Sequence, residues 1–97
     1  MGTADHNSWY STGNESAKNG NYDDALAAYD KALEIDPKYA NAWYNKANAL
    51  RNFGQSLVDK ANDDRTNAPK LVNRSIALFD SADKCYDMGD VLSGKKQ

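Results

Sequence analysis

The residues that could carry out chemistry are few in this chain. Its 97 residues include one histidine, His6, and one cysteine, Cys85. Nucleophilic catalysis needs a base within reach of the nucleophile and a third group that orients the base. His6 stands near the amino terminus without a matched serine, cysteine or carboxylate, and a single cysteine excludes an internal disulfide or a multi-thiolate metal site. We therefore expect no enzymatic activity, and we expect Cys85 to be a small packed hydrophobe.

One segment suggests a cation site, but its residue types exclude it. The stretch from Asp59 to Lys70, DKANDDRTNAPK, begins like a calcium-binding loop. Such a loop needs an oxygen ligand at its third position, glycine at its sixth and a bidentate glutamate at its twelfth. Ala61, Asp64 and Lys70 stand at these positions. The glycines of the chain follow no predicted strand, which excludes a phosphate-binding loop, so no metal and no cofactor are expected.

Charge and hydropathy narrow the choice of partner. Lys and Arg number 12 and Asp and Glu 14, for a net charge of −2 and a pI near 5.2. Binding to a nucleic-acid backbone depends on clustered lysine and arginine, so no nucleic acid is expected. The sequence has no apolar run of about 18 residues and no secretory signal at its start, so we expect a cytoplasmic protein without a membrane span. A protein or peptide partner remains.

The helices that position the remaining polar residues are predicted by an internal repeat. The Trp-Tyr pair at 9–10 recurs at 43–44, and Gly20 recurs as Gly54, all at a separation of 34 residues. A fixed period of this size is typical of stacked helical hairpins. Small and aromatic residues recur at three- and four-residue spacings, which indicates helices. Gly20 separates the two helices of the first copy, and Pro37 ends the second of them.

These residues resemble the tetratricopeptide repeat (TPR) family. The signature positions of the first copy are Trp9, Gly13, Gly20, Tyr22, Ala25, Tyr29, Ala32 and Pro37. The first helix of a second copy is matched at Trp43, Ala47, Leu50 and Gly54. The resemblance is strong over residues 7–54 and weak over 72–86. It implies an all-α superhelix of two stacked antiparallel helical hairpins.

The second copy carries an insert. We align Ser75, Phe79 and Ala82 with Ala25, Tyr29 and Ala32, which leaves 16 extra residues after Gly54. Apolar residues keep helical spacing forward through Gly54 and backward from Phe79. This pattern favours an elongated second hairpin, with helices near residues 40–62 and 68–88. A mobile loop is the alternative, although loops of this length are uncommon in compact domains.

We expect one domain over residues 1–97. The first repeat covers about 7–39, and the second covers about 40–88 with its insert at 55–71. Residues 89–97 are expected to form a tail, in which Gly89 and Gly94 argue against a long capping helix.

The resemblance implies a groove for an extended peptide on the first helix of each hairpin. The matching positions include Asn7 and Ser11. The residues we expect to bind the peptide are Tyr10, Asn14, Lys18, Asn41, Tyr44, Asn45, Asn48, Arg51 and Asn52. Asparagine can both donate to and accept from a peptide backbone, and tyrosine adds broad contact area. A clamp for a terminal carboxylate is not expected, because Tyr10 replaces its lysine and no third repeat supplies further cations. The first hypothesis is a scaffold or adaptor that holds a partner's peptide in this groove. The alternative is that these polar residues only keep the surface soluble and bind nothing.

The last predicted helix carries a second apolar set. Its members repeat every seven positions and are Leu71, Leu78, Cys85 and Leu92. A stripe with nothing to cover it suggests self-association as a homodimer. The alternative function is therefore a structural module that assembles through this helix and the elongated hairpin. Individually exposed apolar residues are common and would carry no such meaning.

Overall fold

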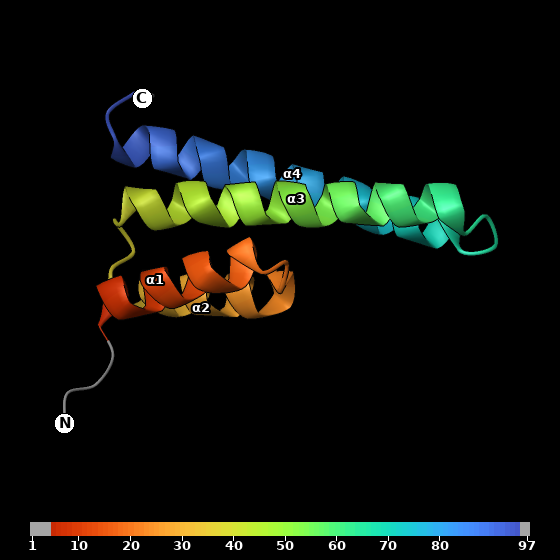
Figure 1. Ribbon diagram of the computed structural model, residues 1–97. Helices are drawn as coiled ribbons and strands as arrows, with labels where there is room; N and C mark the ends of the chain where they lie inside the picture. Colours follow the sequence, from red (N-terminus) through yellow and green to blue (C-terminus); the bar gives the residue numbers. More distant parts are fainter. Residues whose placement is uncertain (1–4, 96–97) are drawn as a thin grey trace.

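The computed structural model describes residues 5–95, which form four helices and no strand (Figure 1). Helix α1 spans His6–Lys18, α2 Tyr22–Ile35, α3 Ala40–Asp63 and α4 Ala68–Leu92. Helices α1 and α2 form one antiparallel hairpin, α3 and α4 form the other, and α2 packs against α3. The predicted all-α fold of two stacked hairpins is confirmed.

The first hairpin is delimited by local chemistry. The Asp5 carboxylate accepts a 2.9 Å hydrogen bond from the Ser8 N–H and so caps the start of α1. This hydrogen bonding holds the pKa of Asp5 below its usual value. The turn into α2 passes through Gly20 with φ +79°, a left-handed conformation that glycine adopts without strain. Asp23 and Asp24 then lie in the first turn of α2, where the helix dipole favours anions.

The second hairpin is elongated, as the apolar spacing predicts. Helices α3 and α4 have 24 and 25 residues, against 13 and 14 in α1 and α2. Figure 1 shows the second hairpin projecting past the first. Gly54 lies inside α3, where the Phe79 ring packs against it, and Leu57, Ala61 and Ser75 are buried beyond it. The insert therefore forms helix and not a mobile loop.

The expected alignment of the last helix is wrong by seven residues. Asn14 accepts a hydrogen bond from the Tyr29 hydroxyl, and Asn48, 34 positions later, accepts one from Tyr86. Tyr86, not Phe79, therefore takes the place of Tyr29. Residues 57 positions apart correspond, and the pairs are Ala25 with Ala82, Ala28 with Cys85, Tyr29 with Tyr86, and Ala32 with Gly89. Seven residues make about two helical turns, so either alignment leaves the same face apolar.

Helix α4 also ends later than expected. It continues through Gly89 to Leu92, four residues beyond the predicted end at 88. Gly89 is buried because the Tyr44 ring of α3 lies over it, with Cε1 only 2.8 Å from where a Cβ would stand. Gly94, with φ +77°, then follows the helix end. Gly89 is thus a site of close helix packing and not a helix terminator.

The prediction that the apolar stripe of α4 is uncovered is wrong for Cys85. Cys85 is 6% exposed and packs with Ala47, Leu50 and Ala82, and Leu78 packs against the same cluster. The other two members, Leu71 and Leu92, are half-buried. Burial raises the pKa of the Cys85 thiol. The charge of Lys46 acts to lower this pKa, and the charge of Asp30 acts to raise it. The physical reason is that this side of α4 faces α3 and not solvent. The exposed large apolar residues of α4 are Val72, Ile76, Met88 and Val91.

Candidate functional site

A hydrogen-bond network joins α1, α2 and α3 on the side predicted to bind a peptide. The Asn45 amide donates to the Tyr10 hydroxyl at 2.9 Å and to Asn14 Oδ1 at 2.7 Å. The Tyr29 hydroxyl donates to the same Asn14 oxygen at 2.6 Å. We call these four side chains the amide–tyrosine network. Three of them were predicted as groove residues, and the structure brings them together, but their polar atoms satisfy one another.

Burial keeps the Tyr29 hydroxyl of this network protonated. Tyr29 is 1% exposed, and burial, assisted by the nearby Tyr10, raises the pKa of its hydroxyl to about 12, while a hydrogen bond with Asn45 opposes the rise. The hydroxyl therefore remains a proton donor at neutral pH. A partly buried network whose members are all bonded favours one arrangement of the elements that carry it. Its first role is to fix how the two hairpins stack.

Two further predicted residues are anchored to α4. The Tyr44 hydroxyl donates to Asp90 Oδ1 at 2.6 Å, and Asn48 accepts from the Tyr86 hydroxyl. The Lys95 ammonium lies 5.3 Å from the centre of the Tyr44 ring, within cation–π range. Sequence reasoning missed Asp90 as a partner, because it lies 46 positions after Tyr44 and no local pattern signals the contact.

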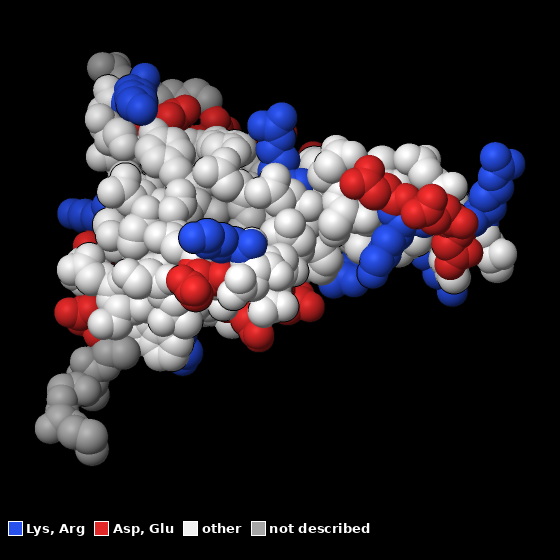
Figure 2. Space-filling view, viewed as in Figure 1, with Lys and Arg blue, Asp and Glu red and all other residues white. Residues whose placement is uncertain are grey.

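The remaining predicted residues belong to α1 and α3 and make no hydrogen bond to the amide–tyrosine network. Those classed as exposed, here called the exposed polar row, are Lys18, Asn41, Arg51 and Asn52. Figure 2 shows this side of the molecule, where few charged side chains lie over α1 and the first half of α3. Acidic and basic side chains gather instead at the far end of the second hairpin. Apart from Lys18 and Arg51, the predicted groove residues on this α1–α3 face are uncharged.

An aromatic cluster closes the amino-terminal end of this face. The Tyr39 ring lies 5.0 Å from that of Tyr10 and 5.1 Å from that of His6, and its hydroxyl donates to Asn7 at 3.3 Å. Burial, with the nearby Tyr10 and Asp36, raises the pKa of Tyr39. Sequence analysis overlooked Tyr39, although an aromatic residue at the junction of two hairpins is a signal that could have found it. His6 contributes an edge-to-face contact here.

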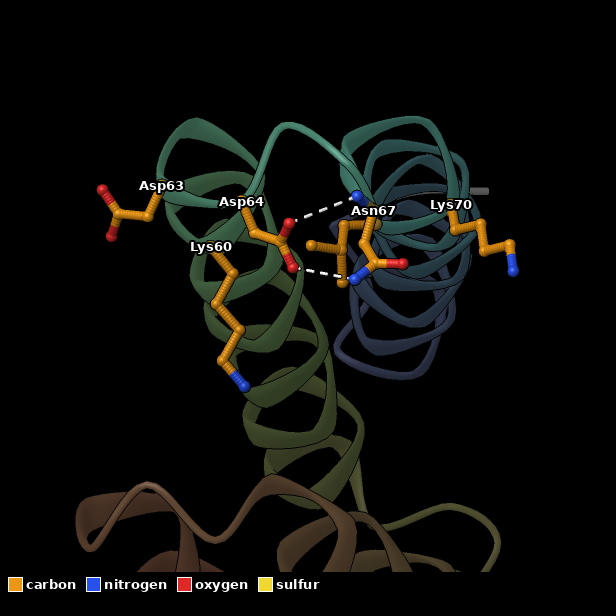
Figure 3. A pocket seen from close by; sticks show the side chains of 6 residues that line it. Lys60, Asp63, Asp64, Asn67 and Lys70 are labelled. Carbon is orange, nitrogen blue, oxygen red and sulfur yellow. Dashed lines mark hydrogen bonds between the residues drawn. The ribbon is translucent and has the colours of Figure 1, made fainter.

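The far end of the elongated hairpin forms a pocket of about 440 Å³ (Figure 3). Asp64 accepts a 2.8 Å hydrogen bond from the Asn67 side chain, which lowers the pKa of the Asp64 carboxyl. The side chains of Asp63 and Lys70 point outward on opposite sides. Within residues 5–95 no three histidine, cysteine or acidic side chains are grouped to hold a metal ion. In the Asp59–Lys70 segment, residues 59–63 end α3, residues 64–67 form the turn and residues 68–70 begin α4.

A second hollow, of about 400 Å³, lies between α2 and α4. Leu26, Leu50 and Cys85 are among its lining residues, and Lys46 there forms a 2.6 Å ion pair with Asp30.

Of the helices described, none is both long enough and apolar enough to cross a membrane.

Comparison with known proteins agrees with this arrangement. Residues 13–54 match the family model of the TPR repeat. The chain is also similar to an uncharacterized protein of Methanocaldococcus jannaschii, with 43% identity over 47 residues. That alignment covers 48% of this chain and 55% of the relative, so the chain spans about half the length of the protein it matches. No solved structure matches the chain significantly.

Proposed function

We propose, on the premise that the chain carries a TPR repeat within a four-helix TPR-like fold, that it is a non-enzymatic scaffold or adaptor. TPR repeats generally mediate protein–protein interaction. The partner would contribute an extended segment that lies across the α1–α3 face. Asparagine amides there can donate to and accept from a peptide backbone whatever its side chains are.

The observation that supports this proposal is the exposed polar row on rigidly joined helices. Asn41, Arg51 and Asn52 are exposed on α3, and Lys18 is exposed on α1. The amide–tyrosine network holds α1 against α3, so the helices that carry these side chains are positioned before a partner arrives. Preorganisation of this kind lowers the entropic cost of binding.

The size of the face limits the length of the peptide. Asn41 and Asn52 are 11 residues apart on α3, or roughly 16 Å at 1.5 Å per residue. An extended peptide rises about 3.3 Å per residue, so about five residues would span this distance. So short a contact is consistent with a weak interaction whose specificity comes from few side chains.

A screen with matched asparagine variants tests the proposal. An array of random twelve-residue peptides is probed with the parent chain, with Asn41→Ala/Asn52→Ala, and with Asn62→Ala/Asn73→Ala as the control. All four asparagines are exposed, but Asn62 and Asn73 lie in the elongated part of the second hairpin. We expect the first double variant to lose captured peptides and the control to keep them. Equal capture by both variants, or no capture by the parent, would refute the proposal.

A second proposal, self-assembly, is favoured by the elongated hairpin. Val72 is 39% and Ile76 53% exposed on the part of α4 that directly follows the insert at residues 55–71. These residues replace the sequence-based stripe, whose Cys85 is buried. Light scattering coupled to size exclusion, over a concentration series, should give a dimer for the parent and a monomer for Ile76→Glu. Lys70→Glu is the control for added negative charge, and a monomeric parent at all concentrations would exclude self-assembly.

A further inference from the structure

The hollow between α2 and α4 shows how the second hairpin receives a helix. Two of its lining residues, Leu26 and Asp30, belong to α2. The others belong to α3 and α4 and are Lys46, Leu50, Ser81, Lys84 and Cys85. Leu33, which follows Leu26 by seven residues or about two helical turns, packs in a neighbouring cluster with Trp43. This side of a hairpin is therefore covered by an amphipathic helix with leucines two turns apart.

The first hairpin carries an equivalent hollow, here called the outer hollow. Its volume is about 420 Å³, and Trp9 and Lys31 are among its lining residues. The others correspond, at separations of 34 and 57 residues, to the lining that the second hairpin supplies. The pairs are Thr12 with Lys46, Ser16 with Leu50, Asp24 with Ser81, Ala27 with Lys84, and Ala28 with Cys85. Within residues 5–95 this lining comes from α1 and α2 alone, with no counterpart of the helix that carries Leu26.

Apolar surface is exposed around the outer hollow. Trp9 is half-buried and Ala27 is exposed. Ile35 lies two turns after Ala28, and so on the same side of α2, and it is 50% exposed. The surface that α2 covers on the second hairpin thus has a counterpart on the first that no other described helix covers.

The chemistry of the lining indicates what fits. Threonine, serine and alanine stand in the outer hollow where the second hairpin has lysine, leucine and lysine. These smaller side chains leave room for an apolar side chain larger than that of Leu26. A second copy stacked in the same way would bring α4, with Asp83 and Asp90 in the places of Leu26 and Leu33. Burying carboxylates against this apolar surface is costly, which favours a helix from another protein.

We propose that the outer hollow binds an amphipathic helix of a protein partner. The helix presents leucine or phenylalanine in the place of Leu26 and leucine seven residues later, in the orientation that α2 has over the second hairpin. This inference goes beyond the proposed function. The outer hollow shares no residue with the amide–tyrosine network or the exposed polar row, and it receives a helix where the α1–α3 face would receive an extended peptide.

A helical peptide copied from α2 provides the probe. It has the sequence of residues 21–36 and is crosslinked between positions 27 and 31, away from its leucines, because so short a helix is marginal in water. The control peptide carries Leu26→Asp and Leu33→Asp, which are the residue types of α4 at these places. Each peptide is titrated into the full chain labelled with nitrogen-15 while amide chemical shifts are recorded.

We expect the copied peptide to shift the amides of residues 9–16 and 24–31, and the control peptide to leave them unmoved. A Leu26→Phe peptide should bind more tightly than the copied one, because it fills the space left by the smaller lining side chains. Weaker binding of the phenylalanine peptide would overturn the size assigned to the partner's side chain.

Matched variants of the chain locate the binding. Ala27→Glu places a carboxylate on the outer hollow, and Ala77→Glu makes the same change at an exposed alanine of α4. We expect Ala27→Glu to weaken the copied peptide about tenfold or more, since the peptide would bury that carboxylate. Ala77→Glu should leave the affinity unchanged. Circular dichroism checks that both variants are folded, as expected for exposed helical positions.

The outcomes decide between occupants. Equal binding of the copied and control peptides, equal weakening by both chain variants, shifts confined to α3 and α4, or no binding at all would overturn the proposal. If the amides of residues 9–16 move when the chain alone is concentrated, the occupant is a second copy and the partner helix is excluded. The asparagine variants of the α1–α3 face test the proposed function separately, so either proposal can fail without the other.

Discussion

Gly13→Ala should destabilise the protein although alanine favours helices. Gly13 is buried in α1, and a Cβ there would lie 2.6 Å from Tyr29 Cε1 and 2.7 Å from Cδ1. Carbon atoms in contact are separated by about 3.5–4.0 Å, so the ring would have to move by roughly 1 Å. Tyr29 is 1% exposed, and its hydroxyl is bonded to Asn14. The ring therefore has no free space to enter without losing that bond.

The expected size of the effect follows from three contributions. Replacing glycine by alanine inside a helix stabilises by about 1 kcal/mol. Overpacking of a filled core costs about 1–3 kcal/mol, and loss of the Tyr29–Asn14 hydrogen bond costs about 1 kcal/mol. We expect a net loss of about 2 kcal/mol in the free energy of unfolding, or a fall in Tm of roughly 10 °C for a domain of this size.

Gly54→Ala provides the matched control. The same helix preference is gained there, but the Phe79 atoms lie 3.0–3.2 Å from the Cβ position, and the ring is only half-buried. A shift of a few tenths of an ångström relieves this contact, so its stability should stay within about 1 kcal/mol of the parent. Urea unfolding followed by circular dichroism measures both variants. A Gly13→Ala protein as stable as the parent, or equal losses in both variants, would refute the reasoning.

Three further predictions concern buried polar groups. The pKa of Tyr29 is raised to about 12 from 10.0, so its contribution to stability is complete below pH 10 and is lost as pH rises toward 12. Urea unfolding at graded pH should show a loss of about 2 kcal/mol in the free energy of unfolding across that window. Cys85, buried and with a raised pKa, should react with a thiol reagent at neutral pH far more slowly than the urea-unfolded chain does, and equal rates would contradict its burial. Asn45→Ala should cost about 1–3 kcal/mol, because Tyr10 and Asn14 lose a partner, whereas the exposed Asn41→Ala should change stability by less than about 0.5 kcal/mol in the same assay.

The sequence was sufficient for the helices because their signals are local. Gly20 between the first two helices and the apolar spacing through Gly54 each depend on residues within a few turns, and the 34-residue period is visible from residue types alone. The shift of the last helix could not be found in this way. Placing Phe79 or Tyr86 opposite α3 differs by about two turns, which preserves the apolar face, and only the contact with Asn48 decides between them.

The sequence predicted which residues lie at the candidate site but not which of them contact one another. Tyr10, Asn14 and Asn45 do lie together, but that their polar atoms bond to one another depends on how closely α1 approaches α3. The burial of Cys85 likewise depends on which side of α4 meets α3. The Tyr44–Asp90 bond joins residues far apart in the chain, and no pattern of spacing predicts it.

The elongated hairpin divides the molecule into parts of unequal cooperativity. The Tyr22 ring, at the start of α2, stacks on Phe53 with 5.6 Å between ring centres. Past Phe53, α3 continues for ten residues to Asp63, roughly 15 Å at 1.5 Å per residue, and packs there against α4. Amide hydrogens in that segment are therefore protected only by the packing of α3 against α4, and they should exchange through local opening. Amide hydrogens of residues between the two hairpins should exchange only when the whole domain unfolds.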